Sequence, residues 1–269
     1  MINLLMRNSC VAAGILLLLA ALVIPARAQI TVGGNGANTS DSTSYSGSQS
    51  LTKIGSNTVT LSGNNTYTGG TLINAGTMVL GGGSSTGGNF NIGNGAELRV
   101  TARDYWFNGT PAFNFMTNGG GTINTWGGVN FIMGGNAIYT SAGGARNRII
   151  GGSGINLNNN TSTFNVARGN DVTTDLEMEA TLWNSGNIVK TGNGIMTLTG
   201  ANSYSGTTDI QAGTLVAANN SALGAGGHSS STMTYIRDGA TLALQGGVSL
   251  SEHFHVWGRA SAVWVRSAT

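Results

Sequence analysis

The chain is poor in cysteine, proline and charge, and each shortage excludes a class of protein. Cys10 is the only cysteine among 269 residues, and it precedes an apolar run near the N-terminus. Beyond that run, disulfides and zinc or iron–sulfur sites built from cysteine are excluded. We therefore expect no metal cluster of that kind and no cofactor.

The shortage of charge excludes nucleic-acid binding and argues for ordered repetition. Charged residues make up 8% of the chain, with 12 basic and 10 acidic side chains, and Lys53 and Lys190 are the only lysines. No basic patch for nucleic acid is present. Disordered chains combine low hydrophobicity with high net charge, whereas this chain is 40% hydrophobic. With 44 glycines and 2 prolines, an ordered repeat is the better interpretation.

The N-terminus predicts export. Arg7 precedes an apolar run from Val11 to Ile24, which closes on Ala26-Arg27-Ala28. A spanning helix needs about 20 apolar residues, so this shorter run with a small-residue cleavage pattern predicts a signal peptide over residues 1–28. We expect a mature chain that starts near Gln29 and has no transmembrane helix.

Two blocks of the chain repeat without a gap. Residues 51–80 match residues 188–217 far beyond what their glycine content explains. The matching pairs include Lys53 with Lys190, Gly55 with Gly192, Leu61 with Leu198, Gly63 with Gly200, Asn65 with Asn202, Tyr67 with Tyr204, Gly69 with Gly206, and Ala75-Gly76-Thr77 with Ala212-Gly213-Thr214. A weaker echo relates residues 95–100 to residues 239–244.

Between the blocks, short stretches of alternating apolar and polar residues predict strands bounded by glycine and asparagine turns. Such strands are Phe113-Asn114-Phe115, Val129-Asn130-Phe131, Ile155-Asn156-Leu157 and Phe164-Asn165-Val166. Short strands with glycine corners are typical of a β-solenoid. Roughly 20 to 25 residues per coil give about ten coils and, at about 4.8 Å per coil, a rod on the order of 50 Å long.

The two blocks resemble the autotransporter-associated β-strand repeat of Gram-negative surface proteins. The resemblance implies a right-handed parallel β-helix passenger, displayed at or released from the cell surface. We expect residues 29–50 to be a polar lead-in, residues 51–258 the β-helix, and residues 259–269 an uncapped tail. An outer-membrane barrel is not expected within this chain, because so few residues follow the last coil.

Each repeat position has a structural interpretation. We expect Leu61, Ile73 and Val79 to fill the core, Gly63 and Gly76 to turn corners, and Asn65 to bond backbone groups at a turn. Tyr67 belongs to the same repeat motif. The equivalent residues of the second block are Leu198, Gly200, Asn202, Tyr204, Ile210, Gly213 and Val216.

The sharpest chemical candidate is the stretch 171–182, whose strict alternation predicts one strand with an acidic face. Asp175, Glu177 and Glu179 would project about 6.6 to 7 Å apart. That spacing suits a calcium site or the paired carboxyls of an inverting glycosidase. The competing interpretation is an outward face made soluble by charge, which we favour because no other motif of those enzymes accompanies it.

Two weaker candidates have similar alternatives. His253 and His255, next to Glu252, could ligate a metal, but a third ligand is not apparent. The aromatic cluster could stack on sugars if exposed, although burial at a coil junction is favoured. This cluster contains Tyr105, Trp106, Phe107, Phe113 and Phe115. The glycine runs lack the Gly-Lys-Ser/Thr of a phosphate loop.

The sequence therefore predicts a non-catalytic, surface-displayed scaffold with a spacer or adhesion role. Its expected partners are surface polysaccharides or host cell-surface proteins. The alternatives are a carbohydrate-active β-helix, either polysaccharide lyase or glycoside hydrolase, and a fragment with no independent role.

Overall fold

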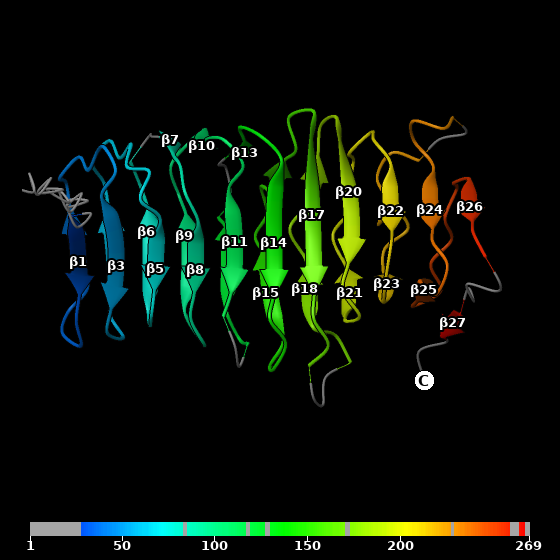
Figure 1. Ribbon diagram of the computed structural model, residues 1–269, viewed down its shortest axis with the longest axis horizontal. Helices are drawn as coiled ribbons and strands as arrows, with labels where there is room; N and C mark the ends of the chain where they lie inside the picture. Colours follow the sequence, from blue (N-terminus) through cyan, green and yellow to red (C-terminus); the bar gives the residue numbers. More distant parts are fainter. Residues whose placement is uncertain are drawn as a thin grey trace, which may run out of the picture.

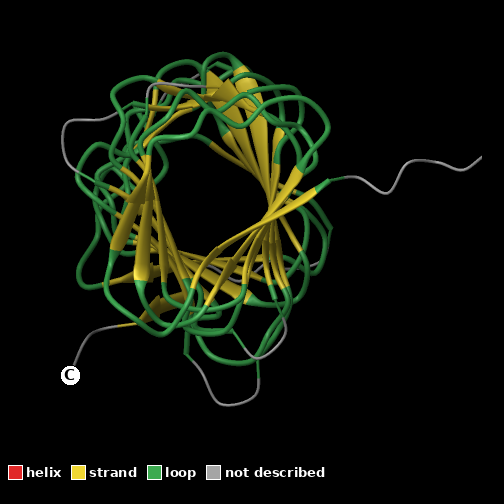
Figure 2. Cartoon of the chain, turned by 90° about the vertical axis from the view of Figure 1, so that its left-hand side faces the viewer, coloured by secondary structure: helices red, strands yellow, loops and turns green. Residues whose placement is uncertain are grey.

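The chain folds into a stack of parallel coils, seen from the side in Figure 1 and along the stacking axis in Figure 2. The computed structural model describes residues 28–82, 85–116, 119–126, 130–169, 173–226, 229–258 and 264–266. These residues contain strands and no helix, which confirms the all-β solenoid. Accordingly, no described segment is a helix able to cross a membrane. Nearly all of the predicted signal peptide, residues 1–27, lies outside the described residues.

Two eleven-stranded sheets run the length of the stack. Sheet A contains β1 (Gln29–Gly33), β3 (Ser50–Ile54), β5 (Thr71–Ile73), β8 (Phe90–Ile92), β11 (Ala112–Phe115), β14 (Ala137–Ser141), β17 (Asn160–Val166), β20 (Gly186–Thr191), β22 (Thr208–Ile210), β24 (Thr234–Ile236) and β26 (Phe254–Val256). Sheet B contains β2 (Thr39–Asp41), β4 (Thr58–Leu61), β6 (Thr77–Leu80), β9 (Glu97–Val100), β12 (Thr122–Thr125), β15 (Asn147–Ile150), β18 (Leu176–Met178), β21 (Ile195–Leu198), β23 (Thr214–Ala217), β25 (Thr241–Gln245) and β27 (Trp264–Arg266).

A third, shorter sheet closes the middle coils. Sheet C contains β7 (Ser85–Thr86), β10 (Tyr105–Phe107), β13 (Phe131–Met133), β16 (Ile155–Asn156) and β19 (Leu182–Trp183). Each strand pairs in parallel with the equivalent strand of the next coil, as β17 does with β20 over six residue pairs. The backbone polar groups are thereby satisfied between coils rather than within them.

Side chains fill the interior that the ribbons of Figure 2 enclose. In β11, Phe113 and Phe115 are buried while Asn114 faces outward, as the alternation predicts. Rings on consecutive strands of sheet A stack at centroid separations of 5.5, 5.0 and 4.6 Å. This column consists of Phe90, Phe113, Tyr139 and Phe164. Each such buried ring stabilises the fold by roughly 2 to 3 kcal/mol.

The two repeat blocks form the same unit, each spanning two neighbouring coils. β3 to β6 of the first block correspond to β20 to β23 of the second, with the same sheet assignments and pairings. Leu61, Ile73, Leu198 and Ile210 are buried in the core, as predicted. On the third side of these coils, the described segments 62–70 and 199–207 contain no strand.

One strand phase was predicted wrongly. In β23, Leu215 and Ala217 face the core, whereas Val216 lies on the outer face and is only partly buried. In β6, Met78 and Leu80 face the core; Val79 is buried as well, at 6% exposed, although it pairs between the outward Thr60 and Arg99. Three successive apolar residues let either phase satisfy the period of two, so the pattern alone could not choose.

Paired strands lie beyond both predicted bounds of the β-helix region, residues 51 and 258. Residues 29–50 already contain β1 and β2, which pair with β3 and β4 and so belong to the solenoid. Within residues 259–269, β27 pairs with β25.

Candidate functional site

The stretch 171–182 is not a single strand. It contains β18 and β19, which belong to different sheets, separated by a corner at residues 179–181. Leu176, Met178 and Leu182 are nevertheless all buried, because the alternation continues across the corner. Asp171 and Val172 lie outside the described residues.

Asp175 is a buried structural carboxylate. Its side chain is fully buried and accepts hydrogen bonds from the backbone nitrogens of Gly169 at 2.6 Å and Ile195 at 2.7 Å. The Arg168 guanidinium donates at 3.1 and 3.0 Å to the two carboxylate oxygens. Because these donors occupy both oxygens, Asp175 ties a loop to the neighbouring coil rather than facing solvent.

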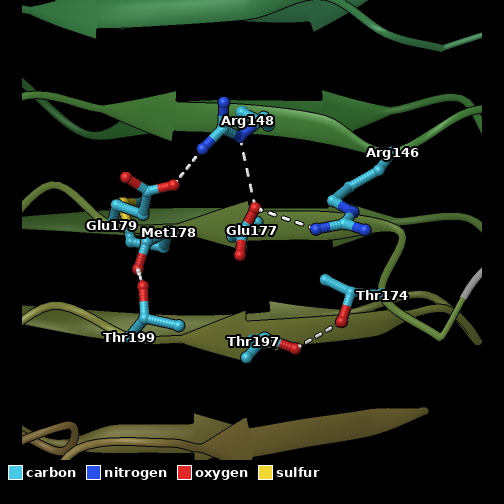
Figure 3. A network of polar contacts seen from close by, with 8 residues as sticks. All are labelled: Arg146, Arg148, Thr174, Glu177, Met178, Glu179, Thr197 and Thr199. Carbon is cyan, nitrogen blue, oxygen red and sulfur yellow. Dashed lines mark hydrogen bonds and ion pairs between the residues drawn. The ribbon is translucent and has the colours of Figure 1, made fainter.

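Glu177 and Glu179 lie in an ion-pair network on the outer face of sheet B, shown in Figure 3. Glu177 accepts from Arg146 and Arg148, each at 3.2 Å, and Glu179 pairs with Arg148. Thr174 and Thr197 share a hydrogen bond at 2.8 Å beside them. The guanidinium groups neutralise the carboxylates, so this face offers an ion pair where a calcium ion would need unpaired oxygen ligands.

Of the other metal candidates, Glu252 and His255 each contact a residue outside the expected metal site. The Glu252 carboxylate accepts a hydrogen bond from Thr234, while His255 stacks on Trp257 with centroids 4.7 Å apart. Within the described ranges, no three His, Cys, Asp or Glu side chains are grouped to hold a metal ion. Burial raises the pKa of Glu252 to about 7, against the opposing hydrogen bond from Thr234.

The aromatic cluster of the middle region is mostly core. Tyr105, Phe107, Phe113 and Phe115 are buried, and only Trp106 is exposed, at 41%. The cluster therefore offers no platform of several rings for a ligand.

The polar residues that sequence reasoning missed are the two lysines. Lys53 and Lys190 point into the interior and are fully buried. Lys190 Nζ donates to the backbone carbonyls of Thr191 at 2.9 Å, Gly192 at 2.8 Å and Ala212 at 3.0 Å. Lys53 makes the same three bonds, at 2.8, 2.8 and 3.0 Å, to Ile54, Gly55 and Ala75.

Each lysine thus joins the corners of two adjacent coils. Three ammonium protons meet three carbonyl oxygens, which is the full donor capacity of the group. Burial lowers the pKa of both side chains, that of Lys190 to about 8 against an opposing effect of Asp175. The sequence does contain a sign of this role, because the only two lysines of the chain occupy the same position of the repeat.

The asparagine and tyrosine of the repeat hold the side of the coil that has no strand. Asn202 accepts from the Leu182 nitrogen at 2.8 Å and donates to the Ala222 carbonyl at 2.6 Å, bridging three successive coils. Asn65 similarly accepts from the nitrogen of Tyr45 at 3.0 Å. Tyr67 shares a hydrogen bond of 2.7 Å with Thr71, and burial raises the pKa of its hydroxyl to about 12.

A shallow groove of about 660 Å³ crosses the outer face of sheet B, beside the loop that Asp175 holds. Its lining includes Thr197, Thr214 and Thr241 on consecutive strands, together with Arg168 and Gln245. The lining has hydroxyl groups but no catalytic pair of carboxylates, so its chemistry suits contact rather than cleavage.

Comparison with known proteins matches the same two blocks to one family. The model of a family described as passenger-associated-transport-repeat matches residues 51–80 and 188–217. The "Adhesin BmaC autotransporter" of Brucella suis biovar 1 (strain 1330) is 31% identical over 204 residues. That match covers 75% of this chain, and the chain spans 5% of the length of that relative. No solved structure matches the chain.

Proposed function

Because this chain is a repeat protein of the autotransporter passenger type, we propose that it is a non-catalytic β-solenoid scaffold that serves adhesion at the surface of a Gram-negative bacterium. The proposal depends on one observation: the polar side chains of the repeat bond other parts of the solenoid. Lys190 and Asn202 donate to carbonyls of a neighbouring coil, and Tyr204 bonds Thr208 at the start of the next strand, so the repeat residues support a rigid rod. The adhesin relative supports a role for that rod in attachment.

The arrangement of carboxylates supports a non-catalytic role. A glycosidase needs two carboxyls facing one cleft, and calcium needs oxygens that no cation occupies. Asp175 is buried beneath Arg168, and Glu177 is held by Arg146 and Arg148. None of these groups is arranged to act on a polysaccharide.

Attachment is tested with beads that carry the purified chain. We expect such beads to adhere to surfaces coated with polysaccharide or to host-cell monolayers more than beads that carry heat-unfolded protein. Equal adhesion of the folded and unfolded samples would contradict an adhesive role for the solenoid.

The enzyme alternative is tested on the same preparation. Neutral and acidic polysaccharides are incubated with the protein, with and without calcium, and new reducing ends and unsaturated products are measured. We expect neither. Cleavage that disappeared in Asp175→Ala and Glu177→Ala would overturn the scaffold proposal.

A further inference from the structure

A row of aromatic and polar side chains lies on the outer face of sheet A, over β22, β24 and β26. The register aligns Asp209 with Tyr235 and Tyr235 with His255. Their neighbours in sequence, such as Thr234 and Ile236, are buried on the inner face. The row therefore faces away from the core.

The row is held in place by its own contacts. The Arg237 guanidinium donates to both oxygens of Asp209, at 2.7 and 3.0 Å. It also lies 5.2 Å from the centroid of Tyr235 and 5.1 Å from that of Trp257. Trp257 in turn stacks on His255 at 4.7 Å. The bidentate ion pair with Asp209 holds the Arg237 guanidinium in place, and the guanidinium contacts both rings and so restricts their orientation.

The His255 and Trp257 rings are exposed although they are held in place, whereas Tyr235 is partly buried. Trp257 is 45% exposed, and large rings held rigid in water are typical of interaction surfaces. Successive coils stack along the sheet axis, so additional coils would lie beside β26 and leave its outer face uncovered. Stacking of further coils would therefore not bury the exposed Trp257 ring.

The chemistry of the row favours a neutral sugar chain. The Arg237 guanidinium lies over Tyr235 and Trp257, and Trp257 stacks on His255, so the exposed parts of His255 and Trp257 are the surfaces that suit the apolar face of a pyranose ring. The Asp209 carboxylate and the Gln211 amide, which share a bond of 3.0 Å, suit sugar hydroxyls. Asp209 and Arg237 cancel each other's charge. The exposed Asp238, next in sequence, leaves the row slightly acidic and disfavours a polyanion.

We propose that Tyr235, Arg237, His255 and Trp257, supported by Asp209, form a binding platform for neutral polysaccharides. The inference rests on the proposed adhesive function and names the ligand class of that function. A flat platform of this size gives a dissociation constant on the order of 1 mM, and several contacts along one polysaccharide strengthen it.

Affinity electrophoresis of the purified chain tests the platform. The protein is run in native gels that contain hydroxyethyl cellulose or galactomannan as neutral probes, and polygalacturonate as the acidic probe. We expect retardation by at least one neutral probe and none by polygalacturonate. Trp257→Ala and Tyr235→Ala should weaken the affinity at least tenfold.

Trp126→Ala is the matched control, because Trp126 is an exposed tryptophan, at 53%, that stacks on Arg99 outside the row. It should leave the retardation unchanged, and thermal unfolding should show that all the variants fold. The platform proposal is overturned if no neutral probe retards the protein, or if Trp126→Ala weakens the retardation as much as Trp257→Ala does. Stronger retardation by polygalacturonate than by the neutral probes would also overturn it. Trp257-dependent binding of a proline-rich peptide in place of the glycans would also overturn it.

The bead assay separates this inference from the proposed function. If Trp257→Ala beads adhere as well as wild-type beads, and the gels show no retardation, the adhesive role stands and the platform is wrong. If the gels show Trp257-dependent retardation but wild-type beads do not adhere, the platform stands and the adhesive role is wrong.

Discussion

At the scale of single residues, the two buried lysines are the most demanding feature of the fold. An ammonium group in an apolar interior is costly unless its protons are bonded, and each lysine reaches three carbonyls. Four of those carbonyls lie in corners beyond the strands, and the other two belong to Ile54 and Thr191, the last residues of β3 and β20, which have no partner in the strand of the next coil. The lysine therefore satisfies the backbone where the ladder of sheet A stops.

Burial lowers the pKa of Lys190 to about 8, because desolvation of its ammonium group is unfavourable. Lys190→Met tests whether the bonds to the three carbonyls stabilise the fold by more than this desolvation destabilises it. The variant keeps the side-chain length but removes the donor of three partly buried carbonyls, so we expect a loss of about 3 kcal/mol in the free energy of unfolding. Urea denaturation measures it, with the exposed Arg103→Met as control. Unchanged or greater stability in Lys190→Met would show that desolvation dominates.

The acidic residues should differ sharply in their contribution to stability. Asp175→Ala removes the acceptor of two backbone nitrogens and the Arg168 guanidinium, so a loss of about 3 kcal/mol or more is expected. Glu179→Ala breaks one exposed ion pair and should cost less than about 1 kcal/mol. Thermal unfolding of both variants checks this, and similar losses would contradict the structural role of Asp175.

At the scale of elements, close approach between coils explains the repeat glycines. A Cβ atom added at Gly206 would lie 2.0 Å from the Gly186 carbonyl oxygen of the preceding coil. We expect Gly206→Ala to cost roughly 3 kcal/mol, because the backbones must separate. Gly152 has no heavy atom within 4 Å of such a Cβ, so Gly152→Ala is the control and should change stability by less than about 0.5 kcal/mol. Equal effects in a urea titration would contradict the packing argument.

The coil that contains β26 should weaken as pH rises. Burial raises the pKa of Glu252 to about 7, so the folded coil retains a proton that the unfolded chain releases near a pH of about 4.3. Its contribution to stability is complete below that lower value and is lost as pH rises through 7. Hydrogen exchange of residues 254–257, corrected for intrinsic rates, should show more protection at pH 5 than at pH 8.

Glu252→Gln should remove most of this dependence. A dependence that persists in Glu252→Gln would contradict its assignment to the Glu252 carboxyl group.

At the scale of the whole molecule, the sequence predicted the architecture better than its local details. Residues 51–80 and 188–217 were recognised as one unit, and Leu61, Ile73, Leu198 and Ile210 were placed in the core correctly. The outward direction of Val216 and the corner within 171–182 were not predicted. Three successive apolar residues allow either set of alternate side chains to face the core, and an alternating pattern can continue through a corner. The carbonyl bonds of Lys53 and Lys190 depend on contacts between coils, which the pattern of one coil does not contain.

Phe254 and Val256 occupy the inward-facing positions of β26. Phe254 and Val256 align with the buried Thr234 and Ile236, yet they are 40% and 46% exposed. Among the described strands, none pairs with the second edge of β26. Apolar core residues beside an open strand edge favour association with another chain. We therefore expect the purified protein to self-associate at micromolar concentrations in sedimentation velocity experiments.

Phe254→Ser combined with Val256→Thr should shift that equilibrium toward the monomer with little change in the unfolding of the central coils, because coils contact only their neighbours. Ile138→Ser is the matched control, since Ile138 is 46% exposed on the outer face of sheet A. A monomeric wild-type chain with strongly protected amides at 256–266 would show that this end is closed by its own residues. Association that survives the double variant but not Ile138→Ser would place the contact on the side of the solenoid.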